Sequence, residues 1–477
     1  MTMKRRGNKT KIIATLGPAS ANAEMIDKLM HAGVDVFRLN FSHGTHDQHA
    51  QTIQLIKEAN KKNKKHVSIL ADLQGPKIRL GEVIPLTVLK EGDELEITTI
   101  PGIGNNKKVY ITYPAFPQDV QKGETILIDD GKIELKVLET NKKDTVKTKI
   151  IFGGPVSSKK GVNLPDTKVS IPSLTEKDHT DLLFALKHGA NWVALSFVRK
   201  ADDIQHLKNI IRHHGSHARV IAKIEKPEAL KNIDAIIDVT DAIMVARGDL
   251  GVEMPVEIVP FTQKDLCRRC LEKTTPVIIA TQMMESMIEN PHPTRAEVTD
   301  VANAVLDGAD AVMLSAETAA GKYPEIVIKT MVRIIEQAEK EDIVFHRRHE
   351  PDKNSPTYLS DAICFNACNI AEEVHAAAIT GMTKTGYTAF MVSSCRPKSN
   401  IYIFTNNKEV VNILNLLWGV EAFYYEGMKG TNNTFKEVQE FLKDRGNLKE
   451  GDVVINLGTM PVKEMARTNT LKISVVQ

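Results

Sequence analysis

The sequence predicts an α/β protein built on a (β/α)8 barrel, with an all-β domain inserted after strand three and a smaller C-terminal α/β domain. Eight short apolar, β-branched runs each precede a helical pattern, which is typical of parallel strands covered on both faces. Residues 77–170 instead alternate with period two, and the barrel pattern stops after residue 343 at the polar run HRRHEPDKNSPT. These observations divide the chain into three domains.

Eight units of this kind favour a closed barrel. An open doubly wound sheet is the alternative, but the chain lacks a Gly-rich dinucleotide loop. The predicted strands are KIIATLG from Lys11, VDVFRLNFS from Val34, VSILADLQG from Val67, WVALSFV from Trp192, RVIAKIE from Arg219, DAIMVARGD from Asp241, TPVIIATQM from Thr275 and DAVMLSAET from Asp310.

Helix starts can be recognised between these strands. Ser173 or Thr175 precedes the helical pattern EKDHTDLLFALKHG, and Pro227 opens a helix over EALKNIDAIID. Thr294, with Glu297 three residues later, predicts a capping box before the next helix.

The inserted segment is predicted to consist of strands joined by turns. DELEITTI, KVYITYP, ETILIDDGKIELKVL and DTVKTKIIF alternate apolar and polar residues, and Asp130-Gly131 predicts a hairpin tip. From Tyr358 onward, helical patterns alternate with AAAITGM, IYIFTN, VEAFYY, DVVINLG and LKISVVQ, so the C-terminal domain should end on a strand.

The composition limits the possible partners. The 62 basic and 60 acidic residues give a formal charge of +2, so no overall field attracts nucleic acid or an anionic membrane. No apolar run approaches the roughly 18 residues of a membrane span, and the basic N-terminus lacks a signal core, which predicts a cytoplasmic protein. Five cysteines, with CRRC at 267–270 lacking a second ligand pair, favour reduced thiols packed on a helix.

Polar residues gather at the C-terminal ends of the predicted strands, where the loops of a barrel converge. Taken singly, each is explained by a surface position or a helix cap, but many buried charges at one rim require a common partner. They are Arg38, Asn40 and Ser42, which alternate along strand two; Asp72; Ser196; Lys223 and Glu225; Arg247, Gly248 and Asp249; Thr281 and Gln282; and Ser315 and Glu317.

This set of residues points to phosphoryl transfer. Glu225 and Asp249 suit a hard divalent cation such as Mg²⁺ or Mn²⁺. Lys223 and Arg38 add positive charge, which stabilises a phosphoryl group in transfer. The chain has no GxxxxGK[ST] loop and no protein-kinase signature, so any kinase activity belongs to another type.

Long motifs run from residue 9 to the last strand, among them KIIATLGPAS, FRLNFSHG, VARGDLGVEMP at 245–255, ATQMMESMI at 280–288 and PTRAEVTDVANAVLDGADAVMLSAETAAGKYP at 293–324. These motifs resemble those of pyruvate kinases. The resemblance implies a TIM barrel (residues 1–76 and 171–343), a β-barrel lid (77–170) and an effector-binding α/β domain (344–477). It also implies a homotetramer that transfers phosphate from phosphoenolpyruvate to ADP in glycolysis, giving pyruvate and ATP.

The same resemblance implies a role for each residue of the site. Lys160 has a second explanation, as part of an exposed basic turn. The implied roles are catalysis by Arg38, Lys223, Thr281, Ser315 and Glu317, the last three around the group that protonates the enolate; substrate binding by Arg38, Lys223, Gly248, Asp249 and Thr281; metal binding by Glu225 and Asp249; and nucleotide binding by Asn40, His43, Arg79 and Lys160.

In the C-terminal domain, TGMTKTGYTAF follows a strand and opens a helix, a turn that can hold a phosphate. Thr383, Lys384, Thr385, Gly386 and Thr388 resemble the family's effector loop, which implies activation by a sugar phosphate or a nucleotide monophosphate. The last loop, GTMPVKEMARTNT, is longer and poorer in glycine than in members regulated by fructose bisphosphate. The identity of the effector, and regulation itself, therefore stay open.

The stretch ADLQGPKIRLG at 71–81 bears on whether the protein requires a monovalent cation. Lys77 stands where potassium-dependent members have glutamate, and Leu73 and Gln74 stand in place of threonine and lysine. The resemblance implies that the Lys77 ammonium replaces K⁺ and that K⁺ is not required. A solvated lid hinge is the alternative explanation. In the potassium-dependent members the ion lies beside residues that match Asn40, Ser42 and Asp72.

Two other functions stay open. One is a barrel lyase that acts on Mg²⁺-bound enolpyruvate, a reaction in which Lys223 and the lid would have no role. Pyruvate release that depends on ADP would exclude this lyase. A non-catalytic sensor would keep only the C-terminal phosphate loop, but every catalytic position that the resemblance implies is occupied.

Overall fold

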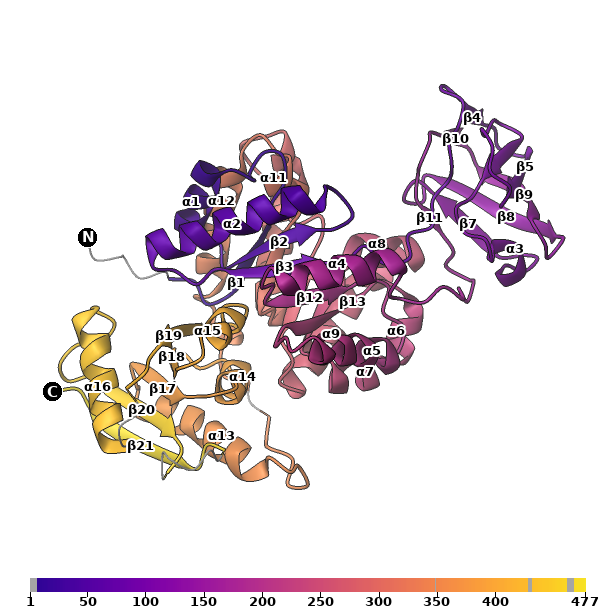
Figure 1. The fold of residues 1–477 in the computed structure, drawn as a ribbon. Helices are drawn as coiled ribbons and strands as arrows, with labels where there is room; N and C mark the ends of the chain where they lie inside the picture. Colours follow the sequence, from indigo (N-terminus) through magenta and orange to yellow (C-terminus); the bar gives the residue numbers. More distant parts are fainter. Residues whose placement is uncertain (1–6, 348, 428–430, 461–466) are drawn as a thin grey trace.

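The computed structural model describes residues 7–347, 349–427, 431–460 and 467–477. Figure 1 shows three bodies: a central barrel, a lid domain that projects to one side, and a C-terminal domain packed against the barrel. The predicted fold class is confirmed. Among the described residues, no helix is both long and apolar enough to cross a membrane.

Eight parallel strands close the barrel in the order β1-β16-β15-β14-β13-β12-β3-β2, which excludes the open sheet. All eight predicted runs contain a strand. The strands are β1 (Lys11–Thr15), β2 (Val36–Asn40), β3 (Ser68–Asp72), β12 (Trp192–Leu195), β13 (Arg219–Ile224), β14 (Ala242–Ala246), β15 (Val277–Ala280) and β16 (Ala311–Leu314).

The barrel is a packed core, as expected where inward and outward faces are both apolar. Inward side chains such as Ile13, Leu70 and Met244 fill the interior, and Ile413 and Leu416 of the C-terminal domain belong to the same cluster. The C-terminal domain therefore closes the end of the barrel opposite the strand C-termini.

Helices surround the strands, and their starts match the sequence with one difference, a break in the helix predicted after Pro227. Thr175, and not Ser173, caps its helix, and Thr294 with Glu297 forms the predicted capping box. The helix predicted after Pro227 is broken at Asn232, whose side-chain amide donates to the carbonyls of Arg199 and Glu228. The helices are α1 (Ala23–Ala32), α2 (His46–Asn63), α4 (Glu176–Lys187), α5 (Ala201–His213), α6 (Pro227–Lys231), α7 (Ile233–Val239), α8 (Arg247–Glu253), α9 (Val259–Glu272), α10 (Arg295–Asp307), α11 (Ala316–Ala319) and α12 (Pro324–Ala338), with 3-10 turns at Val256–Ile258, Glu285–Ile288 and Asp342–Val344.

The lid, all of whose residues are described, has its own apolar core between Leu80 and Leu164. Its six-stranded sheet has the order β11-β7-β8-β9-β5-β6, and β4 pairs with β10. Isolated bridges of Arg79 with Gly161 and of Leu80 with Ile111 lie next to β11 and β6, the two edge strands of this sheet. Apart from the short helix α3, the regular elements of the domain are strands. The elements are β4 (Val88–Leu89), β5 (Glu94–Thr98), β6 (Lys108–Tyr110), α3 (Phe116–Asp119), β7 (Thr125–Ile128), β8 (Ile133–Thr140), β9 (Thr145–Phe152), β10 (Gly154–Pro155) and β11 (Val162–Asn163).

The C-terminal domain has the strand order β19-β18-β17-β20-β21, parallel except for the last strand. The predicted terminal strand is present as β21. In the lid, the predicted hairpin tip at Asp130-Gly131 joins β7 to β8. The elements are α13 (Tyr358–Glu373), β17 (Ala378–Met382), α14 (Tyr387–Ser394), β18 (Asn400–Thr405), α15 (Lys408–Leu414), β19 (Val420–Tyr424), α16 (Thr431–Asp444), β20 (Val453–Gly458) and β21 (Thr470–Val475).

Candidate active site

Lys223 is the centre of the charged rim. Its Nζ donates to Ser196 Oγ at 2.7 Å and lies 2.8 Å from Glu225 Oε1 and 3.4 Å from Asp72 Oδ1. Burial alone would lower the pKa of Lys223, but the charges of Asp72, Glu225 and Asp249 raise it above its ordinary value. The side chain is therefore a fixed cation, 12% exposed, at the mouth of the barrel.

Arg38 is held rigidly beside it. Its Nε donates to Asp72 Oδ2 at 2.7 Å, and its Nη1 donates to Thr15 Oγ1 at 2.8 Å. Burial opposes ionisation of Asp72, yet Lys223 and Arg38 hold the pKa of that carboxyl below its usual range. One buried carboxylate on β3 thus orients both cations, and a bound anion would find them already in place.

Glu225 and Asp249 lie at neighbouring strand ends as predicted. Burial raises the pKa of Glu225, Lys223 opposes that shift, and the charge of Asp249 adds to it. Glu225 Oε2 accepts the Phe197 N–H at 2.7 Å, whereas Asp249 accepts no hydrogen bond from the described residues. The described residues hold no cluster of three His, Cys, Asp or Glu side chains. The Asp249 carboxylate has no side-chain donor among the described residues, and each Glu225 oxygen has one partner and a further lone pair. Such a pair fits Mg²⁺, which keeps waters and substrate oxygens as its other ligands.

Thr281 and Gly248 are linked directly. The Gly248 N–H donates to Thr281 Oγ1 at 2.7 Å, and that hydroxyl donates to the Ala280 carbonyl at 2.6 Å. The N–H of Gly248, a residue that the resemblance assigns to substrate binding, is thus already bonded, so a substrate that uses it must share it or displace the hydroxyl.

Glu317 supports the neighbouring loops through the backbone. Its carboxylate accepts the Ser315 N–H at 2.6 Å and the Met284 N–H at 3.3 Å, and burial raises its pKa. Within the described chain, no hydrogen bond joins Thr281 to Ser315 or Glu317. The expected proton relay through these residues thus lacks a direct link in this structure.

The backbone at two strand ends is strained. Phe197 after β12, and Thr281 and Gln282 after β15, have φ values of 54°, 69° and 54°. A non-glycine residue in this left-handed region costs on the order of 1–3 kcal/mol, and such strain clusters at functional sites. The strain supports the placement of the site at this rim.

Further cations gather where the lid leaves the barrel. Partial loss of water lowers the pKa of His43, and the charges of Lys77, Arg79 and Arg38 lower it further, so these three cations lie near His43. Partial desolvation likewise lowers the pKa of Lys77, and Lys223 adds to this, whereas Asp249 and Glu225 oppose it. This region suits a polyanion such as a nucleotide phosphate.

The predicted surroundings of Lys77 are only partly as expected. β2 ends at Asn40, so the alternation does not continue to Ser42, whose N–H donates to Asn40 Oδ1 at 3.0 Å. The Lys77 ammonium makes no ion pair or hydrogen bond with the described residues. It is exposed, and only its longer-range charge interactions tie it to the rim.

Arg79 and Lys160 lie on the lid side. Arg79 Nη1 donates to the Lys159 carbonyl at 3.0 Å, and Lys160 Nζ pairs with Asp129 Oδ1 at 2.8 Å. Both guanidinium and ammonium groups thus have protein partners that a bound nucleotide would share or replace.

The candidate effector loop joins β17 to α14 as predicted. Its buried hydroxyls have protein partners, since Thr383 Oγ1 accepts the Gly386 N–H at 2.9 Å and Thr388 Oγ1 lies 2.7 Å from Thr468 Oγ1. The exposed residues of the loop are Lys384 and Thr385. Residues 461–466 of the longer last loop lie outside the described residues.

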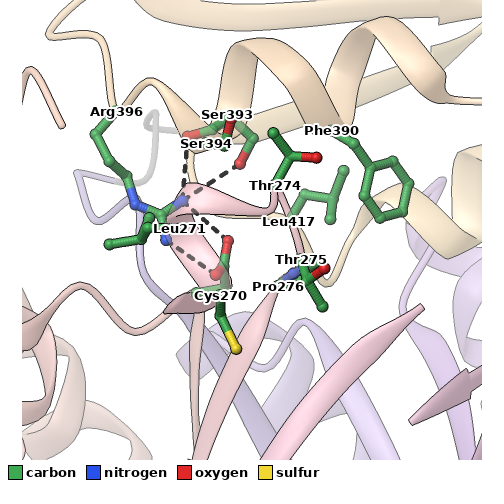
Figure 2. Close-up of a pocket in the computed structure, with 11 residues that line it drawn as sticks. Cys270, Leu271, Thr274, Thr275, Pro276, Phe390, Ser393, Ser394, Arg396 and Leu417 are labelled. Carbon is green, nitrogen blue, oxygen red and sulfur yellow. Dashed lines mark hydrogen bonds and ion pairs between the residues drawn. The ribbon is translucent and has the colours of Figure 1, made fainter. Parts of the chain in front are cut away.

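The pocket in Figure 2 lies at the opposite end of the barrel. It is lined by Pro276 and Asp310, which precede β15 and β16, and by Arg396 of the C-terminal domain. Arg396 is 1% exposed and pairs with Asp310 at 2.9 Å. This site joins two domains and is distinct from the charged rim.

Three residues of the rim were not predicted. Thr15 ends β1 and holds Arg38, Asp300 pairs with Arg247 at 2.5 Å, and Glu253 ends α8. Glu253 follows Asp249 by four residues, a helical spacing that is visible in the sequence. The partner of Arg247 lies 53 residues away, and no local pattern indicates it.

A cationic rim with two carboxylates suited to a divalent cation, on a (β/α)8 barrel that carries an inserted lid domain, defines a phosphotransferase of barrel type. The family model of the pyruvate kinase barrel domain matches residues 7–328, and that of the pyruvate kinase alpha/beta domain matches residues 361–474. The chain therefore belongs to the pyruvate kinase family, whose activity is transfer of phosphate from phosphoenolpyruvate to ADP. The resemblance seen in the sequence is confirmed.

Individual relatives agree with this membership. A pyruvate kinase of Geobacillus stearothermophilus is 43% identical over 99% of this chain and 81% of its own length. A pyruvate kinase of Corynebacterium glutamicum is 42% identical over 98% of both chains. The crystal structure of a pyruvate kinase from Cryptosporidium parvum is similar with a TM-score of 0.92 at 36% identity, and covers 99% of this chain and 97% of that one.

Proposed function

We propose that this chain acts in the cytoplasm as a glycolytic pyruvate kinase, with the phosphoryl group of phosphoenolpyruvate received at the rim around Lys223. The observation that carries the proposal is the charge-fixed Lys223 ammonium, bonded to Ser196 and Glu225 and facing the same opening as Arg38. Phosphoryl transfer needs positioned positive charge more than covalent chemistry. This rim supplies it without reorganisation.

Arg38 and Lys223 bind the phosphoryl oxygens and stabilise the charge that spreads over them during transfer. Thr15 and Asp72 hold the Arg38 guanidinium, so it has few alternative rotamers. Glu225 and Asp249 would hold the divalent cation, which when bound neutralises substrate oxygens. The Asp249 carboxylate, open on one side, leaves room for those oxygens.

Thr281 is placed to orient the group that protonates the enolate. Its hydroxyl lies between the Gly248 N–H and the Ala280 carbonyl, and its strained backbone directs it into the rim. The Glu317 carboxylate accepts the backbone N–H groups of Ser315 and Met284. Glu317 therefore holds the loops after β15 and β16 in place. The enolate receives its proton from a water in this arrangement.

The lid binds the nucleotide and excludes water from the transfer. Lys160 and Arg79 on the lid side and Asn40 and His43 on the barrel are the proposed nucleotide-binding residues, and Arg79 lies close enough to His43 to lower the pKa of that imidazole. The cluster of positive charge around His43 supports phosphate binding there. We take residues 77–170 as this lid, between barrel segments 1–76 and 171–343, and residues 344–477 as the regulatory domain.

Regulation by a phosphorylated metabolite is supported by one contact between domains. Arg219 Nη2 donates to the Thr385 carbonyl at 3.3 Å, and Arg219 begins β13, the strand that leads to Lys223. A sugar phosphate or nucleotide monophosphate bound at the loop can thus act on the catalytic strand. We expect such an activator to lower the phosphoenolpyruvate concentration at half-maximal rate, and Lys384→Glu to abolish that effect. A Lys384→Glu enzyme that is activated as strongly as the unmodified protein would exclude this loop.

Assembly as a homotetramer is supported by two separate exposed apolar patches. Val256 and Phe261 are 71% and 72% exposed on the barrel, and Ile473 and Val475 lie exposed on the edge strand β21. A tetramer with two-fold symmetry needs two different self-complementary interfaces. Light scattering of the purified chain measures this assembly, and a monomer mass would contradict it.

The function is tested by coupling pyruvate release to lactate dehydrogenase with phosphoenolpyruvate, ADP and Mg²⁺. We expect turnover only when all three are present, because Glu225 and Asp249 would hold the cation and the cation would bind the substrate oxygens. Chelation with EDTA should abolish the rate, and added Mg²⁺ or Mn²⁺ should restore it. Pyruvate release without ADP would instead indicate the lyase alternative, and no turnover with every component present would favour the sensor.

A further inference from the structure

Glu253, the last residue of α8, lies where three segments of the chain meet. Its Oε1 is 2.7 Å from Lys226 Nζ and accepts a hydrogen bond of 2.8 Å from Asn163 Nδ2. Lys226 directly follows Glu225, and Asn163 ends β11 of the lid. One carboxylate oxygen, in a side chain that is 1% exposed, therefore joins the metal side of the barrel to the lid.

The same helix carries Asp249. Asp249 and Glu253 are four residues apart, so they lie on one face of α8, separated by one turn. The tip of the β7–β8 hairpin approaches this helix too, because a Cβ at Gly131 would lie 4.0 Å from Val252 Cγ1. The lid thus rests on α8 at two points.

The contact also bears on Lys160. Asn163 lies three residues after Lys160, and β11 pairs with β7, the strand that leads to Asp129, the partner of Lys160. The position of β11 on α8 therefore determines how far the Lys160 ammonium stands from Glu225 and Asp249.

The second oxygen of Glu253 has no partner. Oε2 is buried and accepts no hydrogen bond in the described part of the chain. A buried carboxylate oxygen without a donor is unfavourable, so packing alone does not explain a glutamate here. Because Oε1 holds both donors, Oε2 offers the Asn163 amide a second acceptor when β11 shifts.

We propose that Glu253 is a positioning residue that seats the lid on α8 and so sets the separation between Lys160 and the metal carboxylates. The inference rests on the proposed role of the lid in binding the nucleotide. Without the contact the lid samples more orientations, and a smaller fraction of molecules is competent to bind ADP. The phosphoenolpyruvate contacts of Arg38 and Lys223 belong to the barrel and stay in place.

Asn163→Ala tests the lid side of this contact. We expect KM for ADP to rise about tenfold, because a hydrogen bond to a charged group is lost. KM for phosphoenolpyruvate should change less than about twofold, since its contacts are untouched. Asn106→Ala, which removes an exposed asparagine of the same domain, is the matched control and should leave both KM values unchanged.

Glu253→Gln, alone and combined with Asn163→Ala, tests the barrel side. If the two residues act through one contact, the double variant raises KM for ADP no further than the more severe single variant. Three results would overturn the proposal: additive effects, a normal KM for ADP in Asn163→Ala, or equal rises in both KM values with a lower melting temperature.

A second measurement does not need turnover. Hydrogen exchange at the lid hinges, residues 73–79 and 165–172, should be faster in Asn163→Ala than in Asn106→Ala and the unmodified chain. Unchanged exchange would overturn the seating role even if the chain proves inactive. Failure to form pyruvate, with faster hinge exchange in Asn163→Ala, would count against the proposed function and not against the seating of the lid.

Discussion

Replacing Lys223 with alanine should lower kcat by about 10²- to 10³-fold, the usual loss when one preorganised charge partner of a transition state is removed. The Lys223 ammonium is the cation closest to Glu225 Oε1 and is also bonded to Ser196. No solvent molecule can replace its fixed charge toward the phosphoryl oxygens. The kcat and KM of the variant, measured in the coupled assay, check this expectation.

Stability must be measured alongside activity. Removing Lys223 leaves the buried carboxylates of Asp72 and Glu225 with less compensating charge, which destabilises the folded state. Lys231→Ala, an exposed lysine on the neighbouring helix α6, is the matched control and should retain full activity and melting temperature. A folded Lys223→Ala enzyme with kcat near that of the control would remove Lys223 from the mechanism.

Lys223→Arg separates charge from shape. Arginine keeps the positive charge, but its planar fork cannot occupy the position of a compact ammonium between Ser196 and Glu225. We expect the arginine variant to recover stability and little of the rate. Full recovery of the rate would mean that only net charge matters at this position.

The strands and the charged rim could be predicted because both follow from local patterns. Each barrel strand is a continuous apolar run, and the polar residue that ends it faces the same rim as the others once the barrel closes. Lys223 and Glu225 flank one apolar residue, so their side chains share a face in any strand. Asp72 was placed correctly at this rim for the same reason.

Other features depend on partners distant in sequence. The break at Asn232 requires the Arg199 carbonyl, which belongs to another loop. Thr281 blocks the Gly248 N–H only because β14 and β15 are neighbours in the closed barrel. The Glu253 contact needs the lid in position. Such contacts arise after tertiary assembly, so periodicity and capping motifs carry no signal for them.

The double role of Asp72 explains why the rim tolerates so much buried charge. Asp72 pairs with Arg38 and lies near Lys223, and each cation lowers the pKa of the carboxyl despite its burial. The two cations repel each other less because one anion lies between them.

Replacing Lys77 with glutamate should make activity depend on K⁺. In the unmodified protein we expect kcat to change less than about twofold when tetramethylammonium replaces K⁺, because a tethered ammonium is always present at the rim. In Lys77→Glu, the ammonium is lost and a carboxylate takes its place beside the charges of Lys223, Asp249 and Glu225. The rate without K⁺ should fall by about 10²-fold, and K⁺ should recover part of it.

Lys77→Gln distinguishes a lost charge from a recruited ion. Glutamine removes the ammonium without adding an anionic ligand, so we expect a low rate that K⁺ restores far less than in Lys77→Glu. Lys77 makes no ion pair with the described residues and is exposed, so neither variant should lower the melting temperature. Strong K⁺ stimulation of the unmodified protein would contradict the hypothesis that the Lys77 ammonium replaces K⁺. If both variants instead remain fully active without K⁺, Lys77 is a solvated part of the lid hinge, and its longer-range interaction with Lys223 has no catalytic consequence.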